Sequence, residues 1–381
     1  MREQQQTTTA AQGKPPRRPW AVSFDREKFW RAAAVWSSIG FAAFVGAAAI
    51  GWAYWTGTMP EGKAAVAMRI PPSAPAAPVE GAAAPTRRRL IDGVAVPADA
   101  PEPTGYFAAA IDNLSVARPQ SGIAKASLVF EAPVEGGITR FLAVFAEGEK
   151  VDRIGPVRSA RPYFLDWAAE FDAMFVHVGG SPEALDKLRD YGMRDLNEFF
   201  AGAYFWRDPA RSAPHNAYTS LDRLEEADKK RFSDRKAPEF ASWRFKDDAP
   251  ENERPEEAKV AIEYGDPRMD VSWTYDRASN AWRRSQGGRT KDADGTAILS
   301  KNIVVQYTKV SVIDDVGRRK IATVGEGDAL IALDGMAVHG TWRKDERTSR
   351  TRFYDASGNQ IRFNAGQTWI EVVPTGTKVD Y

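Results

Sequence analysis

An uncharged apolar stretch near the N-terminus constrains the chain most. From Ala32 to Tyr54 the sequence reads AAAVWSSIGFAAFVGAAAIGWAY, about 23 residues without a charged side chain. About 20 apolar residues in a helix cross the hydrocarbon core of a bilayer, and tryptophans, which favour the two interfaces, flank both ends of the stretch. The stretch has no polar face, which argues against a core helix. We therefore predict a transmembrane helix over residues 32–55.

The charged residues around this stretch predict its orientation. Residues 1–31 carry seven Lys or Arg against three Asp or Glu, whereas residues 56–73 carry only Lys63 and Arg69 as basic residues. Basic segments stay on the cytoplasmic side, so residues 1–31 form a cytoplasmic tail and the rest of the chain lies outside the cytoplasmic membrane. A cleaved signal peptide is the alternative. The leader and the apolar run are both longer than such a peptide needs, which favours an uncleaved, single-pass anchor.

The remaining chain divides by composition into a spacer and two folded regions. Residues 56–104 are rich in Ala and Pro and predict an extended linker. Residues 105–245 alternate short apolar runs with helix patterns, which predicts a mixed α/β domain. A charged, proline-containing segment over 246–257 marks a boundary. Residues 258–381 read as short strands between turns, a mostly antiparallel β domain. The predicted fold class is α+β.

Composition excludes several functions. The chain has no Cys and only three His, and its 52 Lys and Arg nearly balance 51 Asp and Glu. Thiolate chemistry and disulfides are excluded, and the balanced charge does not indicate nucleic acid as a partner. No P-loop, dinucleotide fingerprint or HExxH motif is present. We expect no cofactor and no metal, although Glu131 and Glu135 with one His remain a minor metal-binding alternative.

Arginines cluster in two loops and indicate an anion site. Arg158 and Arg161 lie in DRIGPVRSAR just before a helix pattern, and Arg207 and Arg211 lie in FWRDPARSAPHNAY. A further helix is predicted to begin at Ser181, its N-cap, after two glycines. Helix N-termini favour anions, and arginine adds donors that match phosphate or carboxylate. These residues are therefore candidate ligand contacts.

The same arginines have a structural alternative, which is pairing within the fold. Glu131, Glu135 and Asp166 are the candidate partners, and the sequence leaves both readings open. His177 also has two readings, because it lies in an apolar strand pattern where a lone His is more often a satisfied core residue than a ligand.

Proton transfer is the third chemical possibility. His215 follows a proline in a loop and is the better histidine candidate, with Glu135 as a conceivable acid/base partner. Ser159 is a further candidate ligand contact, but it lacks the motif of a nucleophile, since P-V-R-S-A-R is not a nucleophile elbow. The sequence does not decide whether the protein is an enzyme.

At these same segments the chain resembles the YerB-like family of bacterial lipoproteins, which is catalogued as a domain of unknown function. The N-terminal half matches in IDNLSVARPQSG, FEAPVEGGITRFLAVF, IGPVRSAR, VHVGGSPEAL and APHNAY. The C-terminal half matches in NIVVQY, GTWRK and GQTWIEVVP, so the resemblance spans about 111–374.

The resemblance implies a two-domain envelope protein on the outer side of the cytoplasmic membrane. Many relatives attach through a lipid-modified Cys, which this chain lacks, and the predicted helix takes that role here. The recurrent polar residues of the family correspond to Arg118, Glu131, Glu135, Arg140, Arg158, Arg161, His177 and His215.

Three functions follow from these readings. The first is an envelope protein that binds an anionic cell-wall or phospholipid-linked component, or a wall-synthesis protein partner, through an arginine-rich cleft. The second is a hydrolase or phosphotransferase acting on wall polymers or lipid-linked precursors. The third is a structural module whose arginines are all internally paired.

Overall fold

The computed structural model describes residues 85–381 except 235 and 289, and these belong to one compact unit. The predicted cytoplasmic tail, the transmembrane helix over 32–55 and most of the linker lie outside the described residues. None of the helices found within residues 85–381 has the length and apolar character needed to cross a membrane.

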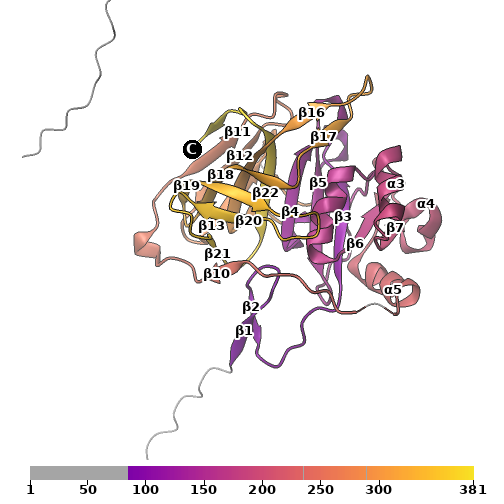
Figure 1. The fold of residues 1–381 in the computed structure, drawn as a ribbon, viewed down its shortest axis with the longest axis horizontal. Helices are drawn as coiled ribbons and strands as arrows, with labels where there is room; N and C mark the ends of the chain where they lie inside the picture. Colours follow the sequence, from indigo (N-terminus) through magenta and orange to yellow (C-terminus); the bar gives the residue numbers. More distant parts are fainter. Residues whose placement is uncertain (1–84, 235, 289) are drawn as a thin grey trace, which may run out of the picture. The chain divides into compact units, whose positions relative to one another are not determined.

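A mixed ten-stranded sheet forms the centre of the molecule, in the order β20-β19-β18-β15-β22-β4-β5-β3-β6-β7 (Figure 1). The pairs β15–β22, β22–β4, β3–β6 and β6–β7 are parallel, and the other neighbours are antiparallel. The strands are β3 (Tyr106–Asp112), β4 (Leu128–Pro133), β5 (Thr139–Ala146), β6 (Met174–His177), β7 (Asp195–Asn197), β15 (Asn302–Thr308), β18 (Gly325–Leu333), β19 (Met336–Lys344), β20 (Arg352–Asp355) and β22 (Thr368–Pro374).

This sheet draws strands from both regions that the sequence separates. Its central pairing joins β22 to β4, with Thr368 opposite Leu128 and Glu371 opposite Glu131. Strands from either side of the 246–257 segment therefore share one hydrogen-bonded ladder. Whether each half also folds alone stays a prediction.

A second sheet of five antiparallel strands has the order β14-β13-β12-β11-β23. Its strands are β11 (Lys259–Ile262), β12 (Val271–Asp276), β13 (Ala281–Ser285), β14 (Leu299–Ser300) and β23 (Val379–Asp380). Four two-stranded pairs complete the β structure: β1 (Thr86–Arg88) with β2 (Ala95–Pro97), β8 (Trp206–Arg207) with β9 (Ala217–Tyr218), β10 (Arg244–Lys246) with β21 (Arg362–Asn364), and β16 (Val310–Val312) with β17 (Arg319–Ile321).

Within residues 85–381 the helices are few and short. They are α2 (Pro162–Ala168), α3 (Pro182–Asp190), α4 (Glu198–Ala201) and α5 (Leu221–Arg231). Of these, α3 begins at the serine cap that the sequence predicts. Ser181 caps α3 by accepting the Ala184 N–H at 3.4 Å, and Ser220 caps α5 in the same way from Arg223. Many strands and few helices agree with the α+β class expected from the sequence.

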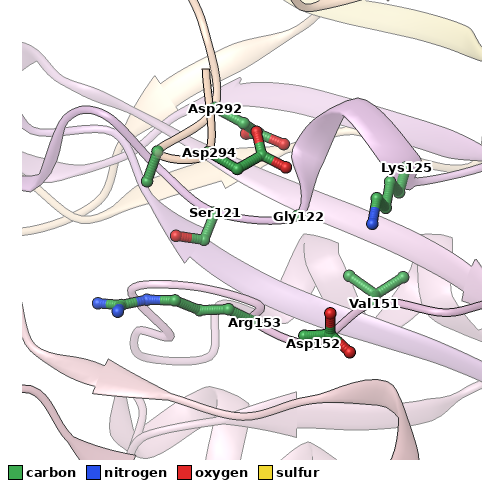
Figure 2. A pocket seen from close by; sticks show the side chains of 9 residues that line it. Ser121, Gly122, Lys125, Val151, Asp152, Arg153, Asp292 and Asp294 are labelled. Atoms are coloured by element: carbon green, nitrogen blue, oxygen red, sulfur yellow. The ribbon is translucent and has the colours of Figure 1, made fainter. Parts of the chain in front are cut away.

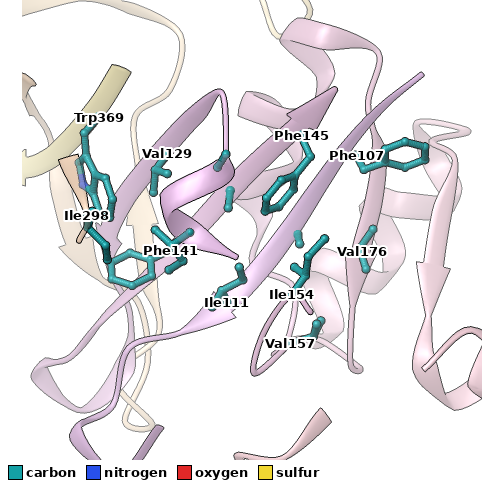
Figure 3. Packing of buried hydrophobic residues seen from close by; sticks show 14 of the residues in the cluster. Phe107, Ile111, Val129, Phe141, Phe145, Ile154, Val157, Val176, Ile298 and Trp369 are labelled. Atoms are coloured by element: carbon teal, nitrogen blue, oxygen red, sulfur yellow. The ribbon is translucent and has the colours of Figure 1, made fainter. Parts of the chain in front are cut away.

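In the middle of the ten-stranded sheet both faces are buried, which explains the continuous apolar runs of strands such as β3 and β5. In β3, Phe107 and Ile111 face one core cluster and Ala108 faces the other. Figure 3 shows part of the first cluster, including Phe141 and Trp369. This cluster continues into the five-stranded sheet, where Trp273 packs edge-on against Trp369. On the other face, α2 covers the sheet, and its Trp167 stacks on Phe130 with ring centroids 5.0 Å apart.

Candidate functional site

The candidate site begins where the buried strand β3 ends. Asp112, the last residue of β3, lies opposite Arg140 on β5. The arginine-containing loop runs beside them, because the Arg158 N–H donates to the Ala110 carbonyl at 2.8 Å. Backbone pairing therefore brings Asp112, Arg140 and Arg158 together from three separate segments.

Asp112 is the centre of this arrangement and is 1% exposed. Its Oδ2 lies 2.6 Å from His215 Nδ1 and 3.0 Å from Arg158 Nε, and its Oδ1 accepts the Leu114 N–H at 3.0 Å. An acceptor at Nδ1 fixes the ring with its proton on that nitrogen, so Nε2 is the free acceptor. Within the described residues, no partner contacts His215 Nε2 or the terminal nitrogens of Arg158.

Arg140 lies beneath these groups and is almost fully buried. Its Nη1 donates to the Ser159 carbonyl at 2.8 Å, while its Nε has no hydrogen-bond partner. Burial lowers the pKa of Arg140 to about 10, and the positive charges of Arg161 and Arg158 act in the same direction. This guanidinium therefore makes the site electropositive and is incompletely compensated.

Arg161 and Glu135 form a closed pair at the edge of the site. Both Nε and Nη2 of Arg161 donate to the Glu135 carboxylate at 2.7 Å, and Nη1 donates to the Ala160 carbonyl. Burial opposes ionisation of Glu135, but the hydrogen bonds and charge of Arg161 outweigh it and lower the Glu135 pKa. Glu135 and His215 thus bond different residues, and the partner of His215 is Asp112.

The turn that carries Glu135 leaves open space beside this pair. Gly136 and Gly137 both have left-handed backbone angles, φ of 71° and 70°, which favour glycine. Both are exposed, and a side-chain carbon added at either would meet nothing within 4 Å. A ligand can therefore approach this turn without a steric barrier from side chains.

The other two predicted arginines hold the loop that carries His215. Arg207 donates to Glu198 at 3.1 Å and to the Asn216 side chain at 3.0 Å. Arg211 donates to the carbonyls of Ala117 and Pro119, both at 2.8 Å. Their donors face the protein, in agreement with the structural alternative for these two residues.

Three further candidates have mainly structural contacts. His177 is fully buried and lies 2.7 Å from the Gly179 carbonyl and 3.0 Å from Asp195 Oδ2, so both ring nitrogens are partnered. Ser181 caps α3. The backbone carbonyl of Ser159 accepts a hydrogen bond from Arg140.

Glu131 and Arg118 belong to a second polar cluster. Glu131 is fully buried and accepts from Arg284 at 2.5 Å and from Thr139 at 2.6 Å. Arg118 donates to the side chain and the carbonyl of Asn113, which itself donates to Glu131. Nowhere among the residues described do three His, Cys, Asp or Glu side chains gather closely enough to hold a metal ion.

Sequence reasoning missed Asp112 and Arg284. In the sequence, Asp112 looks like the first residue of a turn. The signal that could have identified it as a site residue is a carboxylate at the end of the otherwise apolar run YFAAAID. Arg284 gave no local signal, because its partner Glu131 lies on a strand far away in the sequence.

The fold and the site can now be compared with known proteins. Residues 93–235 match the family model described as protein of unknown function (DUF3048) N-terminal domain, and residues 260–370 match the model of its C-terminal domain. The chain belongs to this two-part, YerB-like family, as the sequence motifs predicted.

One curated relative is the Bacillus subtilis (strain 168) protein named "Putative lipoprotein YerB". It is 34% identical over 274 residues, which are 70% of this chain and 80% of the relative. The crystal structure of the YerB protein from Bacillus subtilis is similar with a TM-score of 0.68 and 31% identity, and covers 77% of this chain and 99% of that one.

Proposed function

We propose that this protein is an extracytoplasmic envelope protein, attached to the cytoplasmic membrane by its N-terminal segment, that binds an anionic envelope component at Arg158 and His215. The uncharged stretch over 32–55 and the lipoprotein name of the relative support membrane attachment. The arginines around Asp112 support anion binding.

One observation carries the anion assignment. Asp112 contacts His215 at hydrogen-bond distance and forms an ion pair with Arg158, while the outer nitrogens of both have no partner among the described residues. Arg140 adds charge from beneath. Arg140, Arg158 and Arg161 carry three formal positive charges. Asp112 and Glu135 carry two negative ones. Preorganised, charge-assisted donors of this kind suit phosphate or carboxylate oxygens.

Binding is tested by calorimetric titration of the full-length chain with inorganic pyrophosphate and with a short-chain polyprenyl phosphate. Arg158→Ala should weaken binding by about ten-fold or more, the loss expected for one charge-assisted contact. Arg189→Ala is the matched control, because the exposed Arg189 pairs with Asp186 and with no other acidic residue in the described part of the chain. Equal affinity in both variants contradicts the proposal and directs attention to a protein partner.

Membrane topology needs a separate test. A C-terminal tag should be digested by protease added to intact spheroplasts, and a tag on residue 1 should be protected. The reverse pattern contradicts the outside location of the folded unit, whatever the ligand-binding result.

A hydrolase or phosphotransferase is the second candidate, and the contact between Asp112 and His215 favours it. A carboxylate that fixes the Nδ1 proton leaves Nε2 able to take a proton from an attacking hydroxyl or water. Arg158 would then hold the phosphoryl oxygens. The expected result is release of phosphate from a polyprenyl pyrophosphate. His215→Gln should abolish this release, and changing the pH should not restore it. If the protein binds the polyprenyl pyrophosphate but releases no phosphate, the non-catalytic binding function remains.

A further inference from the structure

Two neighbouring phenylalanines are exposed on the short helix α4. Phe199 is 65% exposed and Phe200 is 82% exposed, whereas every other phenylalanine in the described part of the chain is buried or half-buried. The buried residue of this helix is Ala201, which packs into the first core cluster. Single exposed apolar residues are normal, but an adjacent aromatic pair forms a small apolar patch that a ligand or partner can cover.

The fold places this patch at the same edge of the sheet as the candidate site. Strands β3, β6 and β7 are parallel neighbours, and they end at Asp112, His177 and Asn197. The carboxyl ends of parallel strands lie at one edge, which is where α/β sheets commonly bind ligands. Neighbouring strands are about 4.8 Å apart, so the end of β7, where α4 begins, lies about 10 Å from the end of β3.

Local contacts connect the patch to the loop that carries Arg158. The Phe199 ring lies close to Gly179, where an added side-chain carbon would be 2.8 Å from Phe199 Cε2. The Gly179 carbonyl accepts the Ala160 N–H at 3.0 Å, and the Val178 N–H donates to the Arg158 carbonyl at 3.1 Å. The aromatic surface therefore begins one chain segment away from the arginine whose terminal nitrogens have no partner among the described residues.

Helix α4 is also tied to the loop that carries His215. Arg207 donates to Glu198, the first residue of α4, and to the side chain of Asn216, which follows His215. The helix that carries the phenylalanines thus contacts both segments of the candidate site.

We propose that the anion bound at Arg158 and His215 is the terminal phosphate of a single-chain lipid, an inference that rests on the proposed function. The hydrocarbon chain of this lipid packs on Phe199 and Phe200. Charge complementarity supports the phosphate end, because three arginines there oppose two carboxylates. A terminal phosphate keeps an ionisable hydroxyl, which can donate to His215 Nε2, whereas the diester of a membrane phospholipid has none. Inorganic phosphate leaves the aromatic patch uncovered.

The test compares water-soluble phosphates that differ in their apolar part. The full-length chain in phosphatidylcholine nanodiscs is titrated calorimetrically with methyl phosphate, hexyl phosphate and dihexanoyl phosphatidylglycerol, and empty nanodiscs provide the blank. Each buried CH₂ group raises an affinity about four-fold. Hexyl phosphate should therefore bind at least about ten-fold more tightly than methyl phosphate, and more tightly than the diester.

Phe200→Ser should remove the preference for hexyl phosphate and leave the affinity for methyl phosphate unchanged. Val316→Ser is the matched control, because Val316 is a 66% exposed apolar residue in the turn between β16 and β17, and it should keep the preference. Sedimentation in detergent should give the same mass for Phe200→Ser and the unaltered chain. A smaller mass for the variant would mean that a second copy covers the phenylalanines, which overturns the inference.

Two cavities elsewhere contain lysines that attract phosphate. One, of about 290 Å³, is lined by Lys125 and Arg153 among others (Figure 2). The other, of about 630 Å³, is lined by Lys291 among others. Lys125→Ala and Lys291→Ala should leave both affinities unchanged. If either variant abolishes binding, the phosphate occupies a cavity, and both the inference and the proposed site are wrong.

Failure of the inference and failure of the proposed function give different results. If neither methyl phosphate nor hexyl phosphate binds at millimolar concentration, the proposed function fails and the inference fails with it. If both bind with equal affinity, if Phe200→Ser keeps the preference, or if the diester binds more tightly than hexyl phosphate, the inference is overturned while anion binding stands.

Discussion

Two buried glutamates lie on neighbouring strands, one paired with a buried arginine, and replacing each by glutamine should have very different effects. Glu131 and Glu371 occupy paired positions on β4 and β22, and both are fully buried. Arg284, also buried, bonds Glu131 at 2.5 Å. Glu371 instead accepts from Trp273 Nε1 and from the Tyr264 hydroxyl, both at 2.8 Å.

The two carboxyls should differ in charge. Burial, and then the charge of Glu131, raise the pKa of Glu371 well above its usual value, which favours the protonated, neutral form of this carboxyl. Glutamine resembles a protonated glutamate, since its oxygen accepts from Trp273 and its amide donates to the Tyr264 oxygen. Glu371→Gln should therefore change the free energy of unfolding by less than about 1 kcal/mol.

Glu131→Gln should be costly, because it leaves the Arg284 charge buried without a counter-charge. Breaking a buried pair in this way costs about 3–5 kcal/mol. For a folded unit of roughly 300 residues the unfolding entropy is about 0.6 kcal/mol/K, so Tm should fall by about 5–8 °C. Calorimetric or circular-dichroism melting of the full-length chain measures both variants, with Glu183→Gln, an exposed partner of Lys187, as control.

The pH dependence gives an independent check. A raised folded-state pKa in an acid means that the native protein stabilises the protonated form, so stability falls as pH rises from the ordinary glutamate range toward the folded value. Glu371→Gln should remove that fall. If Glu371→Gln destabilises the protein as much as Glu131→Gln does, Glu371 is ionised in the fold and the reasoning is refuted.

Three further outcomes are expected. Glu170→Ala, which leaves Lys344 and Arg350 buried without their shared carboxylate, should cost about 3–5 kcal/mol in a urea titration, whereas a cost below about 1 kcal/mol would contradict the pairing. Burial raises the Asp292 pKa to about 6. Lowering the pH from 7 to 4 should therefore add up to about 3 kcal/mol to the free energy of unfolding, and Asp292→Asn should lack this gain. Identical pH profiles of stability in the two proteins would exclude a raised Asp292 pKa. Asp112→Asn should shift the NMR resonances of the His215 ring, since it replaces the carboxylate that lies 2.6 Å from Nδ1, and an unchanged spectrum would show that the contact is absent in solution.

Local sequence patterns predicted what depends on local structure. The apolar runs that become β3, β4 and β5, the serine caps of α3 and α5, and the arginine loop beside α2 all follow from spacing and residue type. The pairing of Arg161 with Glu135 agrees with the structural alternative that the sequence left open for these arginines.

Long-range pairings were beyond those patterns. Nothing local in TWIEVVP indicates that β22 lies beside β4, because an apolar strand fits many neighbours and its register is decided by the whole sheet. The roles of Asp112 and Arg284 depend on such pairings. The candidate site was therefore predicted as a set of arginines, but the carboxyl group that orients it was not.

The position of β22 also affects how the chain folds during synthesis. Strand β4 has two neighbours, β5 and β22, and β22 is made from residues 368–374. Until those residues have been synthesised, the other edge of β4 is an unpaired, mostly apolar strand, which is a template for aggregation. A truncation before residue 368 should therefore expose this edge even though the candidate site would be intact in sequence.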